Sequence, residues 1–220
     1  MDIIEAVRSR KSIRGYKPDP IPDEILREII EIAGRSPSAT NSQPWEITVI
    51  KGKVLENIIQ GNIEMSDSGV EPHPDIQRHN LEGKYRQRQA TVAIELFRLM
   101  GIAREDRERR KEWNQLGLRF FNAPVALILC LDKSAGHPQP IFEIGTISQT
   151  ICLVALNYGL GTCIENQGIV YPEVIRKFAG ISESKRIITS IAIGYPDWDY
   201  PANAIESTRE SIDNFVTWLD

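Results

Sequence analysis

The chain contains few cysteines and no surplus of positive charge. Its three cysteines, Cys130, Cys152 and Cys163, are widely spaced, and the first two lie in apolar runs typical of a protein core. An odd, scattered set of this kind is not a disulfide framework and fits a reducing cytoplasm. The formal net charge is −4, whereas general nucleic-acid binders usually carry a basic surplus. We therefore expect a cytoplasmic protein without a nucleic-acid partner.

Histidines and long hydrophobic runs are also scarce. The three histidines, His73, His79 and His137, form no i, i+4 pair and have no cysteine nearby, so we expect no metal site. No stretch approaches the roughly 20 apolar residues of a membrane span. The first seven residues include Asp2 and Glu5, unlike a signal peptide. With 41% hydrophobic and 25% charged residues, we expect one globular domain and no membrane partner.

Hydrophobic periodicity predicts alternating strands and helices. Strands are expected at residues 45–50, 125–131, 162–164 and 187–193. Helices are expected after Asp2, from residue 23 to about residue 35, and at residues 54–59, 85–100, 104–121, 141–158 and 171–179. This alternation indicates a sheet with helices on both faces, of the α/β or α+β class. The helix at 141–158 is apolar nearly all round, which predicts burial in the core or in a subunit interface.

One region lacks this periodicity. Residues 61–83 are polar and contain Pro72, His73 and Pro74, so we interpret them as a long insert without regular structure. Long loops inside compact domains often act as lids over a binding site. A solvated excursion is an equally good interpretation.

The segment Ser9-Arg10-Lys11-Ser12-Ile13-Arg14 holds three cations and two hydroxyls in six positions. Arginine offers a planar fork of donors that matches phosphate oxygens, and serine adds a short neutral donor. The segment therefore predicts a phosphate site. An exposed basic turn is the alternative, and it is the commoner one for such a cluster taken alone.

Two further segments favour a ligand with a planar ring. Residues 36–45 read Ser-Pro-Ser-Ala-Thr-Asn-Ser-Gln-Pro-Trp, and such short polar side chains can face the polar edge of a ring. An ordinary helix-to-strand loop is the alternative. Residues 159–166 begin Gly-Leu-Gly, which lets backbone amides approach a ligand, but no G-x-G-x-x-G fingerprint precedes a helix there. Cys163 has no histidine near it in sequence, which argues against a nucleophile.

In this order, the motifs resemble those of the nitroreductase family of FMN-dependent oxidoreductases. Arg10-Lys11-Ser12-Ile13-Arg14 is similar to the family's Arg-Arg-Ser-x-Arg motif, and residues 36–45 are similar to its most recognisable loop. Gly194-Tyr195-Pro196 and Arg209 resemble its C-terminal pattern. The resemblance covers residues 1–220 as one domain and is weakest at about 61–121, where family members carry a variable insert.

The resemblance implies an α+β fold, with a mainly antiparallel central sheet between helices and a homodimer that exchanges its termini. It places FMN at the dimer interface, with substrate contacts from Tyr85 and Arg88. The implied FMN contacts are Arg10, Lys11, Ser12, Arg14 and Arg209 at the phosphate and ribityl chain, Pro37, Ser38 and Asn41 of the other subunit at the ring, and the backbone of Cys163, Ile164 and Glu165 at its N5 edge.

The implied activity is ping-pong transfer of hydride from NADH or NADPH, through FMN, to nitroaromatic, quinone or similar aromatic acceptors. No catalytic side chain is expected, because the flavin performs the redox chemistry. One alternative is reductive dehalogenation, as in the deiodinase branch of the superfamily. An alternative of another class is a flavin-binding sensor or carrier that does not turn over.

Overall fold

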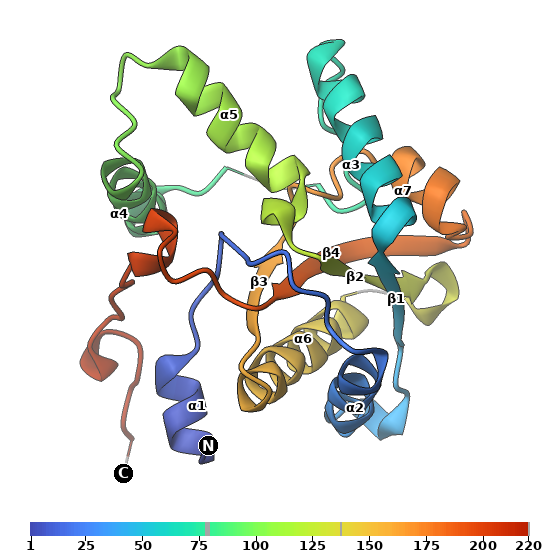
Figure 1. Ribbon diagram of the computed structural model, residues 1–220. Helices are drawn as coiled ribbons and strands as arrows, with labels where there is room; N and C mark the ends of the chain where they lie inside the picture. The colour runs from blue at the N-terminus through green and yellow to red at the C-terminus, as the bar shows by residue number, and fades with distance from the viewer. Residues whose placement is uncertain (78–79, 137, 220) are drawn as a thin grey trace.

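A computed structural model of the chain describes residues 1–77, 80–136 and 138–219, so His79 and His137 lie outside the described residues. The centre of the fold is a sheet of four strands in the order β1-β2-β4-β3, and each neighbouring pair is antiparallel (Figure 1). The strands are β1 (Trp45–Lys51), β2 (Val125–Asp132), β3 (Gly161–Glu165) and β4 (Lys185–Gly194). All four predicted strands are confirmed, and the antiparallel pairing settles the class as α+β.

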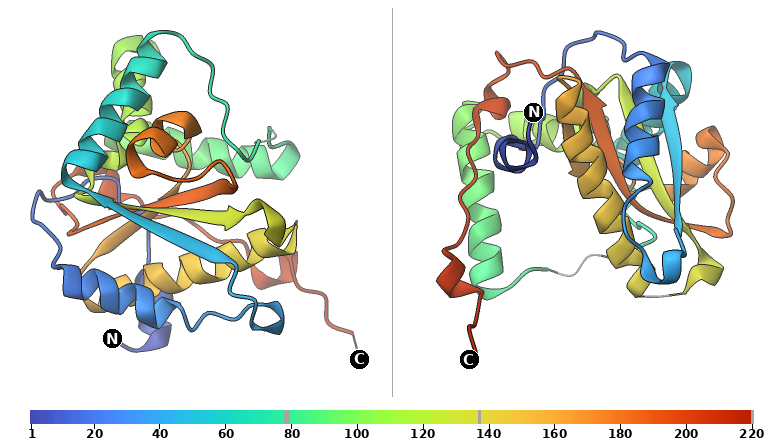
Figure 2. Two further views of the ribbon diagram at one scale, coloured as in Figure 1. Left: turned by 90° about the vertical axis from the view of Figure 1, so that its right-hand side faces the viewer. Right: turned by 90° about the horizontal axis from the view of Figure 1, so that it is seen from below.

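Helices cover both faces of the sheet, as Figure 2 shows. The helices are α1 (Ile3–Ser9), α2 (Asp23–Ala33), α3 (Gly52–Asp67), α4 (Gly83–Leu99), α5 (Arg107–Leu118), α6 (Gln139–Asn157) and α7 (Pro172–Ala179). Helices α2 and α6 pack together on one face, and α3 and α7 pack together on the other. Asp2 caps α1 as predicted, because its carboxylate accepts the Glu5 N–H at 2.9 Å.

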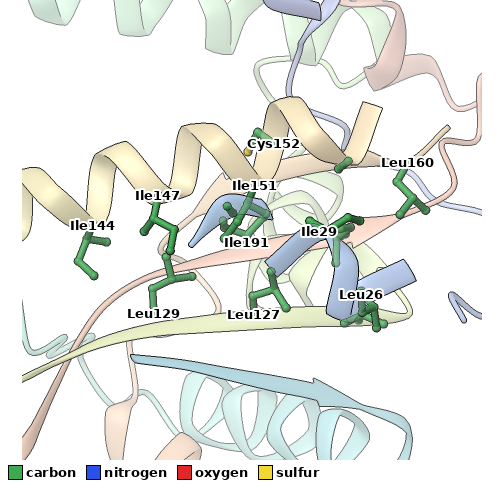
Figure 3. Packing of buried hydrophobic residues seen from close by; sticks show 14 of the residues in the cluster. Leu26, Ile29, Leu127, Leu129, Ile144, Ile147, Ile151, Cys152, Leu160 and Ile191 are labelled. Atoms are coloured by element: carbon green, nitrogen blue, oxygen red, sulfur yellow. The ribbon is translucent and has the colours of Figure 1, made fainter. Parts of the chain in front are cut away.

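Strand β2 is buried on both faces and divides the core in two. Val125, Leu127 and Leu129 point towards α2 and α6, whereas Ala126 and Ile128 point towards α3 and α7. Successive side chains of a strand alternate between faces, so one apolar run serves both halves. Figure 3 shows the α6 side of this packing. Full burial of such side chains stabilises the fold by about 1.5–3 kcal/mol each.

The predicted loop at residues 61–83 is partly wrong, because α3 continues to Asp67, and the described residues that follow, 68–77 and 80–82, contain no helix or strand. Gly61 does not end the helix. A Cβ there would lie 2.6 Å from Val174 Cγ1, so glycine lets α3 and α7 pack closely. Asn62 is fully buried, and its amide donates to the Leu118 and Gly168 carbonyls at 3.1 and 2.8 Å. Gly61 and Asn62 resemble loop residues in the sequence. In the structure, Gly61 allows close packing of α3 on α7, and Asn62 bonds α3 to neighbouring segments.

Among the described helices, α6 is long and apolar enough to cross a membrane by length and composition. This corrects the expectation that no segment approaches such a span. Ile144, Ile147 and Ile151 are each at most 2% exposed and pack on the sheet (Figure 3). The apolar character of α6 is therefore explained by its place in the core, although Phe142 near its start is 73% exposed.

The N-terminal helix and the C-terminal tail lie apart from the sheet, and both termini lie on the same side of the molecule (Figure 1). A small separate cluster of Leu96, Ala202 and Ile205 joins α4 to the beginning of the tail. Helix α5 begins at residue 107, later than predicted, because Asp106 caps it by accepting the Arg109 N–H at 3.0 Å. The charged face at residues 104–111 is largely exposed, as predicted.

Candidate flavin site

The basic segment, residues 10–14, lies along the outer edge of β3. The Ile13 N–H donates to the Thr162 carbonyl at 3.0 Å, and Ser12 pairs with Thr162 as an isolated parallel bridge. A Cβ on Gly161 would lie 2.5 Å from Ile13 Cγ1, so this glycine of the Gly-Leu-Gly motif allows the close approach. The structure therefore brings together two motifs that are about 150 positions apart in the sequence.

Asn203 fixes the other side of the basic segment. It is 1% exposed, and its Oδ1 accepts the Arg14 N–H at 2.7 Å. Its Nδ2 donates to the Gly15 and Asp197 carbonyls, each at 2.7 Å. The backbone that carries Arg14 is thus held on both sides, by β3 and by the start of the tail.

The cations of the segment have no counter-ion. Within the described part of the chain, Arg10, Lys11 and Arg14 form no ion pair, although each is half-buried. Arg14 donates at 3.4 Å to the Ser12 carbonyl, a weak internal contact. Adjacent like charges repel one another, and partial burial reduces their hydration. An anion bound here would relieve both costs, so the basic-turn alternative fits the structure less well than an anion site.

Strand β3 gives Cys163, Ile164 and Glu165 three different environments. Cys163 is 3% exposed, and burial raises the pKa of its thiol to about 12, so it remains a thiol at neutral pH and does not act as a nucleophile. The Ile164 side chain is half-exposed. Glu165 is buried, and its carboxylate accepts the Gln167 and Gly168 N–H groups at 2.6 and 2.9 Å. Glu165 therefore shapes the turn that follows the strand.

The loop at residues 36–45 is a rigid structure rather than a loose connection. It contains a short 3-10 turn, Ala39–Asn41, in which Thr40 and Asn41 have φ of 51° and 60°. The Ser38 hydroxyl accepts the Gln43 N–H at 2.9 Å. Left-handed φ is unfavourable for a β-branched residue such as Thr40, so surrounding contacts must hold the turn in place.

Helix α6 supplies those contacts. Glu143 is 3% exposed, and its carboxylate accepts the Ala39 N–H at 2.7 Å and the Ser42 hydroxyl at 3.4 Å. Thr146 donates to the Pro37 carbonyl at 3.3 Å, and Thr150 accepts the Ser36 hydroxyl at 2.8 Å. Sequence reasoning missed this role of α6. The signal was present, because Glu143 is the single charged residue in the apolar run at 141–158.

The loop and the basic segment lie at opposite ends of α6. The loop is held at Glu143, near the start of the helix, whereas the basic segment reaches Thr162, just beyond the end of the helix at Asn157. Glu143 and Asn157 are about 20 Å apart at the usual helical rise. In the view from below in Figure 2, the two segments lie near different ends of this helix. One copy of the chain therefore does not place both motifs around one small ligand.

The predicted substrate residues lie in a third place, on α4. Tyr85 and Arg88 line a groove of about 1110 Å³, together with Lys84, Arg209 and Glu210. The Arg88 guanidinium lies 5.7 Å from the centre of the Tyr85 ring and pairs with Glu210 at 2.9 Å. Arg209 is exposed and donates to Ser207 and Thr208 of its own tail. The tail meets the basic segment through Asn203, and the phosphate contact of Arg209 stays a prediction.

No cluster of His, Cys, Asp and Glu suited to a metal ion occurs among the described residues. The Cys130, Cys152 and Cys163 thiols are all free and buried. The polar groups that converge on the candidate site are therefore arginine, lysine, serine and backbone groups, which suit an organic phosphate better than a metal.

Known proteins match the chain along its length. The Nitroreductase family model matches residues 7–195. A 4-nitrobenzoate reductase of Pseudomonas putida is 30% identical over 220 residues, which cover 99% of this chain and 96% of that protein. Another, of Nocardioides sp. (strain LMS-CY), is 28% identical over 222 residues, which cover 97% and 88%. The crystal structure of the FMN- and NADPH-dependent nitroreductase NfnB from sphigopyxis sp. strain HMH is similar with a TM-score of 0.93 and 29% identity, over 100% of both chains. The chain belongs to the nitroreductase family.

Proposed function

We propose that this chain is an FMN-dependent oxidoreductase that transfers hydride from NADPH or NADH to nitroaromatic acceptors. The observation that carries the proposal is the basic segment, where three half-buried cations that form no ion pair with a described residue lie against the edge of β3. Two 4-nitrobenzoate reductases that match nearly the whole chain, and a solved FMN- and NADPH-dependent relative, support the same activity.

The residues present fit FMN. Arg10, Lys11 and Arg14 supply the charge for its phosphate, and the Ser12 hydroxyl adds a neutral donor. The edge of β3 beyond Thr162 offers backbone groups for the polar side of the ring, at Cys163, Ile164 and Glu165. Arg209, on a tail that leaves the body of the chain close to Arg14, is placed to join the phosphate when the tail rests on a second copy.

A second copy completes the site in this proposal. The loop that lines the ring, with Pro37, Ser38 and Asn41, is about 20 Å along α6 from the basic segment of its own chain, so it serves the flavin of the other copy. Exposed apolar side chains support such a dimer. They are Ile3 at 67%, Phe142 at 73%, Trp218 at 76% and Leu219 at 90% exposure. Exposed apolar surface of this kind is typical of an interface.

The chemistry divides between cofactor and protein. Bound FMN supplies the hydride acceptor and donor. The basic segment anchors its phosphate, the β3 backbone orients the ring, and the loop excludes water from one side. No side chain of the described residues is required as a nucleophile, since the Cys163 thiol is kept protonated by burial. The three buried thiols also fit the cytoplasm, where reduced nicotinamide is available.

The groove on α4 favours an anionic aromatic acceptor, such as a nitrobenzoate. Tyr85 offers an aromatic surface that is 55% exposed. Lys84 and Arg88 lie 5.5 and 5.7 Å from the centre of its ring, and Arg88 pairs with Glu210 at 2.9 Å. A carboxylate stacked there would contact Lys84 and would take the place of Glu210 at Arg88. The two 4-nitrobenzoate reductases among the relatives agree with this chemistry.

Anaerobic titration tests the proposal. Addition of NADPH to the flavin-loaded protein should bleach the flavin absorbance, and 4-nitrobenzoate should then restore it with formation of a reduced nitro product. A flavin that stays oxidised with both NADPH and NADH would contradict the proposal and favour a sensor or carrier. Turnover of halotyrosine without turnover of any nitroaromatic would favour reductive dehalogenation instead.

A further inference from the structure

A stripe of polar residues on α6 lies beneath the loop at residues 36–45. Glu143, Thr146 and Thr150 have the spacing i, i+3, i+7, which places them on one side of a helix. Each of these three side chains forms a hydrogen bond with the loop, at Ala39, Pro37 and Ser36 respectively. The same helix packs its isoleucines on the sheet. Helix α6 therefore connects the rigid core directly to the loop.

Glu143 differs from the two threonines in charge and in burial. It is 3% exposed, and its carboxylate forms no ion pair with a described cation. Its described partners are the Ala39 N–H and the Ser42 hydroxyl. An ionised group at this depth is costly unless it is hydrogen-bonded. A neutral side chain would be sufficient for packing in the core, so the carboxylate is best explained by its hydrogen bonds to the loop.

What Glu143 holds is a strained turn. Ala39 begins the 3-10 turn that contains Thr40 and Asn41, both with left-handed backbone. The Ala39 N–H is one of the donors that such a turn leaves unpaired, and a carboxylate is a strong acceptor for it. Loss of that acceptor would free the turn to relax towards ordinary φ values. The exposed Asn41 side chain would then leave its present position.

We propose that Glu143 is a positioning residue that fixes the ring-contacting loop for the flavin of the other subunit. This inference rests on the proposed function, in which the loop lines the FMN ring. Glu143 itself does not touch the flavin and acts through the Ala39 and Ser42 contacts. The effect belongs to the ring and not to the phosphate, because the phosphate of that flavin would be held by the other subunit's own basic segment.

The test compares Glu143→Leu and Glu143→Gln with a matched control, Ser148→Ala. Ser148 lies on the same helix, is 2% exposed, and donates within the helix to the Ile144 carbonyl at 2.6 Å. The full-length apoproteins are titrated with FMN and with riboflavin, which has the ring but lacks the phosphate. The absorbance spectrum of the bound flavin, the oligomeric state and the melting temperature are measured in parallel.

Glu143→Leu should weaken FMN and riboflavin by the same factor, at least about tenfold, and should shift the absorbance maximum of the bound flavin. Glu143→Gln keeps a carbonyl oxygen for the Ala39 N–H and should stay within about threefold of the wild type. Ser148→Ala, which removes only a hydrogen bond within the helix, should change neither affinity. If Glu143→Leu does not fold, Glu143→Asp, which withdraws the carboxylate by one methylene, should show the same equal loss for both flavins.

Wild-type affinity in a folded Glu143→Leu or Glu143→Asp variant would overturn the inference while leaving the proposed function intact. A loss confined to FMN would also overturn it, because that result would place the effect at the phosphate. A wild-type protein that binds neither flavin would refute the proposed function and this inference with it.

Discussion

The segments at the two ends of α6 differ in how their polar and charged groups are paired. At its start, the loop at residues 36–45 has its turn bonded to buried or half-buried groups of the helix, so its conformation is set before any ligand arrives. Beyond its end, the basic segment has a fixed backbone, but its cations have no counter-ion among the described residues. The first region has the character of a preformed wall, and the second has the character of an anion site. Because about 20 Å separates them in one chain, the comparison supports the proposal that the site is shared between two copies.

The largest effect on FMN affinity is expected when positive charge is removed from the basic segment, at one end of α6. Arg10→Ala combined with Arg14→Ala should weaken FMN by about 100-fold or more, since each charge-assisted hydrogen bond is worth about 1.5–3 kcal/mol. Riboflavin lacks the phosphate, so it should bind the double variant and the wild type with the same affinity. Fluorescence titration with the two flavins measures the difference, and Arg104→Ala, on an exposed charged face, is the control. An equal loss for both flavins would mean that the segment does not hold the phosphate.

A smaller effect is expected in the groove, which belongs to neither end of α6. Arg88→Gln should lower kcat/KM for 4-nitrobenzoate by about tenfold, as for loss of one charged hydrogen bond. For nitrobenzene, which has no carboxylate, kcat/KM should change by less than about twofold, and FMN affinity should be unchanged. Steady-state assays with both acceptors measure this. The same loss for both acceptors would remove the argument for an anionic substrate.

The smallest effect concerns strain in the preformed wall. Thr40 has φ of 51°, and asparagine tolerates this region better than a β-branched residue. Thr40→Asn should therefore raise the free energy of unfolding by about 0.5–1 kcal/mol while FMN affinity stays within about twofold. Chemical denaturation of the apoprotein measures the first quantity. A destabilised variant would show that the Thr40 side chain makes a contact that offsets the strain.

Much of the fold was predictable from the sequence, because apolar periodicity is a local property. The continuous apolar run at residues 125–131 predicted a strand, which the structure confirms and buries on both faces. The extension of α3 to Asp67 was not predictable, because Gly61 and Asn62 look like loop residues until Val174, Leu118 and Gly168 are seen beside them. Those partners are about 55 to 115 positions away, and periodicity contains no information about them.

The motifs of the candidate site could be predicted from the sequence, but their arrangement in space could not. The basic segment and the Gly-Leu-Gly motif meet through Thr162, and Gly161 is needed there because Ile13 lies against it. Nothing in the sequence showed that Asn203 clamps Arg14 or that Glu143 holds the loop, since both depend on tertiary contacts. A lone carboxylate in an apolar helix was the one local signal, and burial of such a group usually indicates a specific partner.

Mixed dimers test the shared site most directly. One chain, with its own affinity tag, has Arg10→Ala and Arg14→Ala. The other, with a different tag, has Ser38→Trp, which places a bulky ring where the loop would meet the flavin. Each variant alone should bind FMN weakly at both sites. The purified mixed dimer should bind one FMN per dimer with wild-type affinity, because one site then combines an intact basic segment with an intact loop. A mixed dimer without any site of wild-type affinity would contradict the account, because it would mean that both motifs of one site come from the same chain.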